Sequence, residues 1–174
     1  MGKTYIITDT HFNGRVYARI DPDYTERIFE NWKKIVKPED IVIHGGDIAS
    51  GKFTKIADRI KEMPGYKILT RGNHDCSTDE KYLQVFDEVR YQYIKDGIVY
   101  SHFPVNPEIY NCEYNIFGHF HRYPNNIKDS LVRRYKDFYD FKKNFTFCIA
   151  DWDFCPIDVN IFTKKCFEHA ELCV

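Results

Sequence analysis

The feature that most constrains this chain is that its histidines stand where apolar, strand-like segments end. Five of the seven histidines have this position. The segments are short and rich in Ile, Val, Leu and Tyr, which predicts buried β-strands. We expect strands at residues 3–8, 41–43, 66–70, 97–101 and 114–117. The motifs at their ends are Asp9-Thr10-His11, Gly45-Gly46-Asp47, Gly72-Asn73-His74-Asp75, His102 and Gly118-His119-Phe120-His121.

Helical patterns separate the first three of these strands. Apolar residues recur at helical spacing over residues 22–36, where Pro22 and Asp21 suit a helix start, and again over 53–63. A short helix is expected at 79–87, before a half that is rich in strands. A late strand at 145–150 and a helix within 153–165 close the chain. This order predicts an α/β domain built in layers.

The bulk composition fits one globular domain over residues 1–174. Hydrophobic residues make up 43% of the chain and aromatic residues 17%, which suits a packed core and excludes a disordered chain. A net charge of −1 excludes a basic field over the whole surface for nucleic acid. No apolar run reaches the ~18 residues of a membrane span, and no signal peptide is recognisable, so we expect a soluble, cytoplasmic protein.

The side chains at the strand ends are of the kinds that bind metal ions. In open α/β sheets the carboxyl ends of the strands form a crevice where ligands bind. Imidazole and carboxylate together favour Zn, Fe, Mn or Ni over Ca. The number of candidates exceeds one tetrahedral site and suits two cations that share a carboxylate, an arrangement known in phosphoryl chemistry. The candidate ligands are Asp9, His11, Asp47, Asn73, His102, His119 and His121.

Each motif taken alone has a plainer interpretation. Asp9 would cap a turn or a helix, His11 would lie on the surface, and Gly45-Gly46-Asp47 would be an ordinary turn. These interpretations do not explain why all the motifs fall at successive strand ends. His74 adjoins Asn73 but is not needed as a ligand, so it is a candidate general acid.

Taken together, the motifs resemble the signature blocks of the calcineurin-like metallophosphoesterase superfamily. Ser101-His102-Phe103-Pro104 is similar to the His-Tyr-Pro block of its small, single-domain members from bacteria and phages. The resemblance covers residues 9–121 and implies a four-layer αββα sandwich, in which helices flank two sheets. It also implies two divalent metal ions, with Mn preferred and Fe, Zn or Ni as alternatives.

The resemblance further implies roles for individual residues. Asp9, His11 and His121 would bind the first metal ion. Asn73, His102 and His119 would bind the second, and Asp47 would bridge the two. A bridging hydroxide would then attack the phosphorus of a phosphate monoester or diester, while His74 helps the leaving oxygen to depart.

Three further positions bear on function. Asp75 matches a family position, where it would either hold the loop or act electrostatically. Arg71 would either bind a substrate phosphate through two hydrogen bonds or pack on the loop. Ile48-Ala49-Ser50-Gly51 follows Asp47 where the protein-phosphatase branch has an Asp-Arg-Gly run, which argues against a Ser/Thr protein phosphatase.

Two other functions are alternatives to a phosphatase or phosphodiesterase. Segment 122–143 is expected to be irregular and flap-like, with seven basic, three acidic and five aromatic residues. Basic and aromatic side chains suit single-stranded nucleic acid, which favours a nuclease, although a solvated flap with packed aromatics is the plainer interpretation. A non-catalytic metal-binding scaffold on the same fold is the other alternative, and the complete ligand set argues against it.

Overall fold

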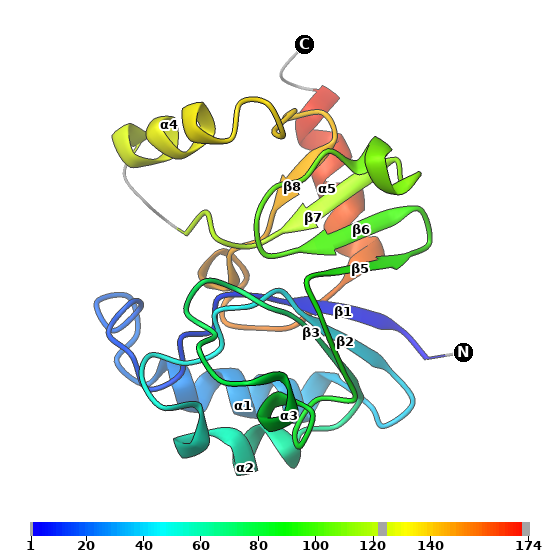
Figure 1. Cartoon of the computed structure of the whole chain (residues 1–174). Helices are drawn as coiled ribbons and strands as arrows, with labels where there is room; N and C mark the ends of the chain where they lie inside the picture. The colour runs from blue at the N-terminus through cyan, green and yellow to red at the C-terminus, as the bar shows by residue number, and fades with distance from the viewer. Residues whose placement is uncertain (1, 122–124, 172–174) are drawn as a thin grey trace.

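The computed structural model of the chain describes residues 2–121 and 125–171, which form two β-sheets between layers of helices (Figure 1). The first sheet has the strand order β4-β3-β2-β1-β9. Its strands are β1 (Thr4–Ile7), β2 (Ile41–His44), β3 (Tyr66–Thr70), β4 (Glu88–Arg90) and β9 (Ile157–Asp158). The strands β1 to β4 are parallel, and β9 adds an antiparallel edge next to β1.

The second sheet has the order β5-β6-β7-β8. Its strands are β5 (Gln92–Lys95), β6 (Ile98–Ser101), β7 (Tyr114–Phe117) and β8 (Asn144–Thr146). The strands β6, β7 and β8 are parallel, and β5 is antiparallel to β6. The two sheets share one hydrophobic core, in which Ile6 and Ile43 of the first sheet join Tyr100 and Ile116 of the second.

Helices cover the outer faces of both sheets, which confirms the predicted four-layer αββα sandwich (Figure 1). The helices α1 (Tyr24–Ile35), α2 (Ala57–Lys61) and α3 (Asp79–Tyr82) lie against the first sheet. The helix α5 (Val159–Glu171) packs on the second sheet, where Phe167 contacts Tyr114 and Phe145. The helix α4 (Asn125–Arg134) lies beyond the end of β7. Short 3-10 turns occur at Phe53–Lys55, Pro107–Tyr110 and Ile149–Trp152.

The helix α1 shows how the apolar pattern sets the packing. Its buried side chains are Tyr24, Ile28, Phe29 and Trp32, which fall on one face at helical spacing. The helix begins at Tyr24, two residues later than Pro22 suggested. The expected cap by Asp21 is wrong, because its carboxylate accepts from the Asp23 amide before the helix begins.

Three expected elements differ from the structure. Segment 122–143 is irregular only in part, since α4 occupies Asn125–Arg134, residues 135–143 form turns and loops, and Arg122 to Pro124 lie outside the described residues. The helix expected at 79–87 ends at Tyr82, whose buried ring packs on Phe53 at 4.6 Å. The strand expected at 145–150 is β8, which ends at Thr146 before the 3-10 turn at Ile149–Trp152.

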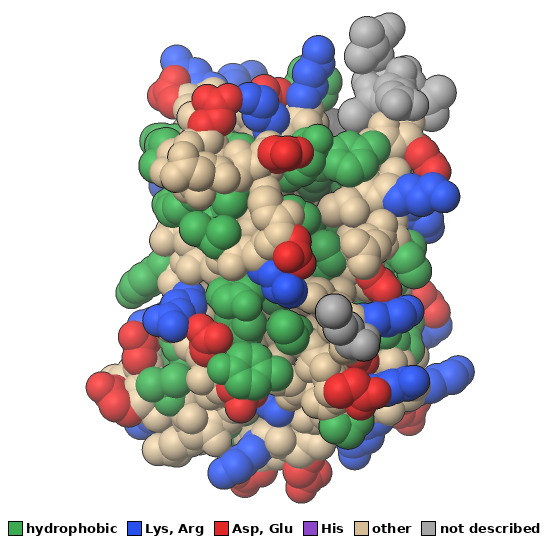
Figure 2. All heavy atoms as spheres, turned by 90° about the vertical axis from the view of Figure 1, so that its right-hand side faces the viewer, with side chains coloured by type: hydrophobic (Ala, Val, Ile, Leu, Met, Phe, Trp, Pro, Cys, Tyr) green, Lys and Arg blue, Asp and Glu red, His purple; other side chains and the backbone are tan. Residues whose placement is uncertain are grey.

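The parallel strands of both sheets bring their carboxyl ends to the same side of the molecule. The opposite side, where the N-terminus lies, is drawn in Figure 2. Among the described residues no histidine side chain is visible on that face, and basic and acidic side chains stand beside one another. The histidines of the strand-end motifs therefore gather at one end of the sandwich, where ligands bind in folds of this kind.

Candidate metal centre

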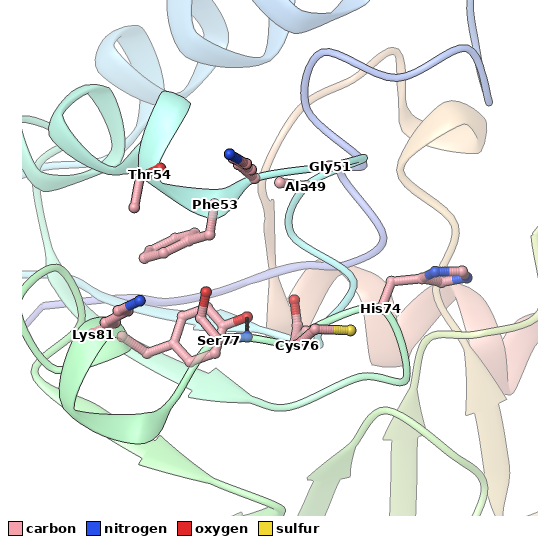
Figure 3. Close-up of a pocket in the computed structure, with 11 residues that line it drawn as sticks. Ala49, Gly51, Phe53, Thr54, His74, Cys76, Ser77 and Lys81 are labelled. Atoms are coloured by element: carbon pink, nitrogen blue, oxygen red, sulfur yellow. Dashed lines mark hydrogen bonds between the residues drawn. The ribbon is translucent and has the colours of Figure 1, made fainter.

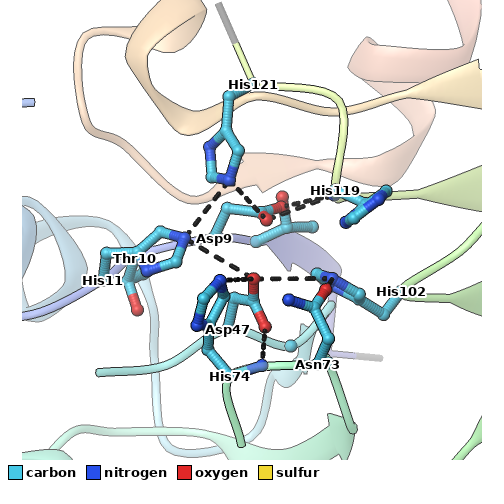
Figure 4. A network of polar contacts seen from close by, with 12 residues as sticks. Asp9, Thr10, His11, Asp47, Asn73, His74, His102, His119 and His121 are labelled. Atoms are coloured by element: carbon cyan, nitrogen blue, oxygen red, sulfur yellow. Dashed lines mark hydrogen bonds and ion pairs between the residues drawn. The ribbon is translucent and has the colours of Figure 1, made fainter. Parts of the chain in front are cut away.

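The loops that follow five parallel strands bring the seven predicted ligands into one cluster (Figure 4). Three of these loops leave the first sheet and two leave the second, so the cluster lies between the sheets. The ligands from the first sheet are Asp9, His11, Asp47 and Asn73, and those from the second are His102, His119 and His121.

The first group of candidate ligands is buried. One ligand atom from each of Asp9, His11, Asp47 and His121 lies within 4.8 Å of the others. The Nε2 atoms of His11 and His121 are 3.2 Å apart, and His121 Nε2 is 3.4 Å from Asp9 Oδ1. Two carboxylates and two imidazoles around one point are a suitable donor set for a divalent cation such as Zn, Fe or Mn.

The second group of ligands is more open. His102 is buried, and its Nε2 atom lies 3.0 Å from Oδ1 of Asn73. The His119 ring is 5.1 Å from the His102 ring, centroid to centroid. Asn73 is exposed and His119 is half-buried, in contrast to the first group.

The Asp47 carboxylate lies between the two groups (Figure 4). Its Oδ2 atom is 3.6 Å from His11 Nε2 on one side and 3.5 Å from His102 Nε2 on the other. Its Oδ1 atom accepts a hydrogen bond of 2.8 Å from the backbone amide of His74. The carboxylate thus has the position that a ligand shared by two cations needs.

The backbone is strained at four of the seven ligands. Asp9, His11, Asp47 and His119 have φ values of 52°, 40°, 55° and 64°. A non-glycine residue in this region costs about 1–3 kcal/mol and persists only where neighbouring structure enforces it. Here the Asp9 amide donates to the Gly46 carbonyl at 2.9 Å, and the His11 amide donates to the Asp47 carbonyl at 3.0 Å. The loops after β1 and β2 therefore hold each other in the strained form.

Glycines leave the space that the two central carboxylates occupy. A Cβ atom on Gly72 would lie 2.2 Å from Oδ1 of Asp47, and one on Gly118 would lie 2.2 Å from Oδ2 of Asp9. Both carboxylates are buried, so neither could move into solvent to avoid the clash. These glycines thus let the loops approach the carboxylates closely.

Hydrogen bonds fix the orientation of three imidazoles. His102 Nδ1 donates to the Gly45 carbonyl at 2.8 Å, which leaves Nε2 facing Asp47 and Asn73. His121 Nδ1 lies 2.9 Å from the Tyr17 hydroxyl, and His119 Nε2 lies 3.4 Å from the Tyr135 hydroxyl. Such contacts on the far nitrogen orient a metal-binding histidine and raise its basicity.

Burial sets the protonation of the cluster. It lowers the pKa of His11 to about 3, and those of His102, His119 and His121 to about 4. At neutral pH these rings are uncharged and keep a lone pair for a ligand bond. Burial also raises the pKa of Asp9 and of Asp47, because it removes each carboxylate from water. A bound cation would offset that cost, so the donor chemistry fits a metal ion.

The three residues predicted to act in catalysis have different surroundings. The His74 side chain is 62% exposed, and its Nε2 atom lies 4.0 Å from Asp47 Oδ2 at the rim of the cluster. Asp75 is buried and accepts hydrogen bonds from three backbone amides, those of Asp47, Ile48 and Gly72. Asp75 thus ties the loop after β2 to the loop after β3, which agrees with the loop-holding alternative.

The position of Arg71 does not support contact with a substrate phosphate. One terminal nitrogen pairs with Asp79 at 2.7 Å. The other donates to the carbonyls of Asp75 and Ser77 at 2.6 and 2.9 Å. Because both terminal nitrogens are engaged by residues 75–79, Arg71 packs on the loop in this structure.

Several supporting residues could not be identified from the sequence. Tyr17 lies 104 positions from the histidine that it contacts and Tyr135 lies 16 positions from its own, and no motif marks either tyrosine. His44 is a buried residue that supports the cluster. It ends β2, and its ring lies between the Gly46 amide at 3.2 Å and the Thr10 hydroxyl at 3.0 Å.

Two cavities meet at the rim of the cluster. One of about 460 Å³ lies over His11 and His121. The other, of about 470 Å³, extends toward Phe53 and Tyr82 (Figure 3). Both cavities are lined by Ala49, Gly51, His74 and Cys76. There is accordingly room for a small organic ester beside the cluster.

Comparison with known proteins gives the class of the molecule. The sequence model of the calcineurin-like phosphoesterase family matches residues 2–171, so the chain belongs to that family. An uncharacterized protein of Methanocaldococcus jannaschii, MJ1445, is 27% identical over 132 residues, which cover 70% of each chain. The crystal structure of AQ665, a protein of unknown function from Aquifex aeolicus, matches with a TM-score of 0.69 and 26% identity, over 94% of this chain and 99% of that one.

The family and the buried Asp/His cluster together point to divalent metal binding and to metal-dependent hydrolysis of phosphoesters. Among residues 2–121 and 125–171, no helix is both long and apolar enough to cross a membrane.

Proposed function

We propose that the chain hydrolyses phosphate monoesters or diesters with two divalent cations, of which Mn is the preferred ion and Fe, Zn and Ni are alternatives. The observation that carries this proposal is the place of Asp47, whose Oδ2 atom lies within 3.6 Å of imidazoles from both ligand groups. A single carboxylate between two donor groups suits a pair of cations better than one.

We assign the donors to two cations as the family resemblance implies. Asp9, His11 and His121 would hold the first cation, together with Asp47. Asn73, His102 and His119 would hold the second, again with Asp47. When bound, the cations supply Lewis acidity that activates water near neutral pH and screens the charge of the phosphate.

The remaining steps belong to the side chains of the protein. His74 stands at the rim, exposed to solvent and 4.0 Å from Asp47 Oδ2, where it can meet the ester oxygen of a bound substrate. Its imidazole would donate a proton to that oxygen as the bond to phosphorus breaks. Asp75 would keep Asp47 and the His74 loop in register through its three amide contacts.

A non-catalytic scaffold is the competing function. It predicts bound metal without turnover. The complete donor set and the open position of His74 favour the enzyme, because a scaffold needs no proton donor at the rim.

The test is a paired assay of the metal-loaded protein. Hydrolysis of p-nitrophenyl phosphate and of bis-p-nitrophenyl phosphate is measured with Mn²⁺, Ni²⁺ and Zn²⁺, and the bound metal is quantified in the same samples. We expect turnover of at least one ester. The ratio of the two rates then separates a monoesterase from a diesterase.

The His74→Ala variant is the matched control. It should keep its metal content, since His74 is not a proposed ligand, and lose turnover by roughly 10²–10⁴-fold, as is typical when a general acid is removed. No turnover of any ester by wild-type protein with metal bound would favour the scaffold. Loss of metal from His74→Ala would show that the division of roles is wrong.

A further inference from the structure

A small apolar pocket lies directly beside the second ligand group. It has a volume of about 330 Å³ and is lined by Phe103, Pro104, Val105, Tyr135 and Phe138. Two loops of different origin form it, since Phe103 to Val105 follow β6 while Tyr135 and Phe138 follow α4. The metal ligands take no part in the lining, so the pocket is distinct from the metal centre.

Two residues connect this pocket to the metal centre. The Phe103 ring lies 4.7 Å from the His119 ring, and the Tyr135 ring lies 5.8 Å from it. The Tyr135 hydroxyl also contacts His119 Nε2 at 3.4 Å. If the phosphate of a substrate lies at the metal centre, the organic group attached to that phosphate would therefore reach the pocket.

The pocket suits a flat aromatic ring. Its walls are two phenylalanines, a tyrosine and two aliphatic side chains, and the Phe103 and Tyr135 rings are inclined by only 30°. Phe138 is 51% exposed, so an apolar face that a partner could cover is left open to solvent. Planar rings stack on such side chains in a way that tolerates different bases.

The segment that carries Tyr135 and Phe138 is also positively charged. Arg133, Arg134 and Lys136 are exposed in it, against one exposed acidic residue between Tyr135 and Phe138, Asp137. Cationic side chains beside aromatic ones favour an anionic ligand that also carries a ring. A purely apolar ligand would make no favourable electrostatic interaction with these basic side chains.

We propose that this pocket binds the base of a nucleoside phosphate ester whose phosphate group lies at the metal centre. The inference rests on the proposed function and names its substrate class. Phe138 and Phe103 would act as specificity residues, and Tyr135 would contact both the base and His119.

The test measures what the base adds to binding. The metal-loaded full-length chain is titrated calorimetrically with a uridine phosphonate, in which carbon replaces the 5′ ester oxygen so that hydrolysis is blocked. The same ribose phosphonate without the base serves as the reference. We expect the uridine compound to bind about tenfold more tightly, a lower-end value for stacking of one base.

A matched pair of variants assigns this difference to the pocket. Phe138→Ala should reduce the ratio of the two affinities to about one. Phe141→Ala should leave the ratio unchanged, because Phe141 is similarly exposed, at 54%, in the same segment but does not line the pocket. Equal affinities in the wild-type protein, or equal effects of the two variants, would overturn the inference.

A second titration tests whether the base belongs to a nucleic acid strand or to a free nucleotide. A single-stranded oligothymidylate that binds more tightly than the mononucleotide compound, with strong salt dependence, would identify nucleic acid strands as the ligand. Equal binding would identify free nucleotides, and both results support the pocket. Hydrolysis of bis-p-nitrophenyl phosphate without any effect of the base would overturn the pocket and leave the proposed function intact.

Discussion

The two ligand groups of the centre differ in how firmly the fold prepares them. Asp9, His11 and His121 are buried, and with Asp47 they already bring their ligand atoms within 4.8 Å of one another. In the second group Asn73 is exposed and His119 is half-buried. The first group also has two carboxylates, counting Asp47, while the second has only Asp47. A cation should therefore bind more tightly at the first group, since both rigidity and ligand charge increase affinity.

The largest expected effect comes from Asp47→Asn, because this residue serves both groups. The change keeps the shape of the side chain and removes the shared negative charge. We expect both cations to bind at least ~100-fold more weakly and hydrolysis to fall below detection. This loss of metal affinity is larger than the 10–100-fold loss typical when a residue that hydrogen-bonds to a metal ligand is removed. Metal content after dialysis against Mn²⁺ measures the loss. Retention of one tightly bound equivalent would show that Asp47 does not connect the groups.

A second pair of variants separates the two groups. Asp9→Asn should abolish binding of the tightly bound Mn²⁺ equivalent, because the change removes a buried carboxylate charge. The amide oxygen of the new side chain can still accept the hydrogen bond from the His119 backbone amide. Asn73→Ala should remove the weak equivalent and leave the tight one in place. Equilibrium dialysis over a range of Mn²⁺ concentrations distinguishes the two losses. If both variants lost the same equivalent, the assignment of ligands to two groups would be wrong.

The smallest expected effects come from the two tyrosines whose hydroxyl groups contact ring nitrogens of the candidate histidine ligands. Tyr17→Phe should weaken the tight equivalent about tenfold, because the Tyr17 hydroxyl lies 2.9 Å from His121 Nδ1. Tyr135→Phe should weaken binding of only the second Mn²⁺, and by less than tenfold, because the contact of Tyr135 with His119 is longer at 3.4 Å. Both variants keep the aromatic ring, so packing is preserved. Identical shifts in both equivalents for either variant would argue for a general loss of stability.

The sequence pattern was sufficient to predict a layered α/β domain and to predict that the candidate ligands lie together. Short apolar segments alternate with helical ones, and the polar residues directly after the strands converge because parallel strands end on the same side. Asp9 and Asp47 could be predicted in this way, since each depends only on the strand that precedes it. The glycines at positions 72 and 118 were visible as well, although only the structure shows which carboxylate each one accommodates.

Other features depend on contacts between distant segments and could not be predicted. Tyr17 supports His121 across 104 positions of the chain, and no local pattern marks such a pair. The direction of Arg71 depends on the turn at residues 75–79, which offers two carbonyls and Asp79. The helix α4 was not predicted. Leu131 and Val132 have helical spacing with the residues before them, but the many basic and aromatic residues of segment 122–143 obscured this pattern.

The most direct test of the proposed centre relates activity to bound metal. Metal-free protein is titrated with Mn²⁺, and hydrolysis of bis-p-nitrophenyl phosphate is followed together with the number of equivalents bound. We predict little hydrolysis while the first, tight equivalent binds, and a rise to full activity as the second binds. Full activity with one equivalent, or none with two, would contradict a centre in which Asp47 joins two cations for catalysis.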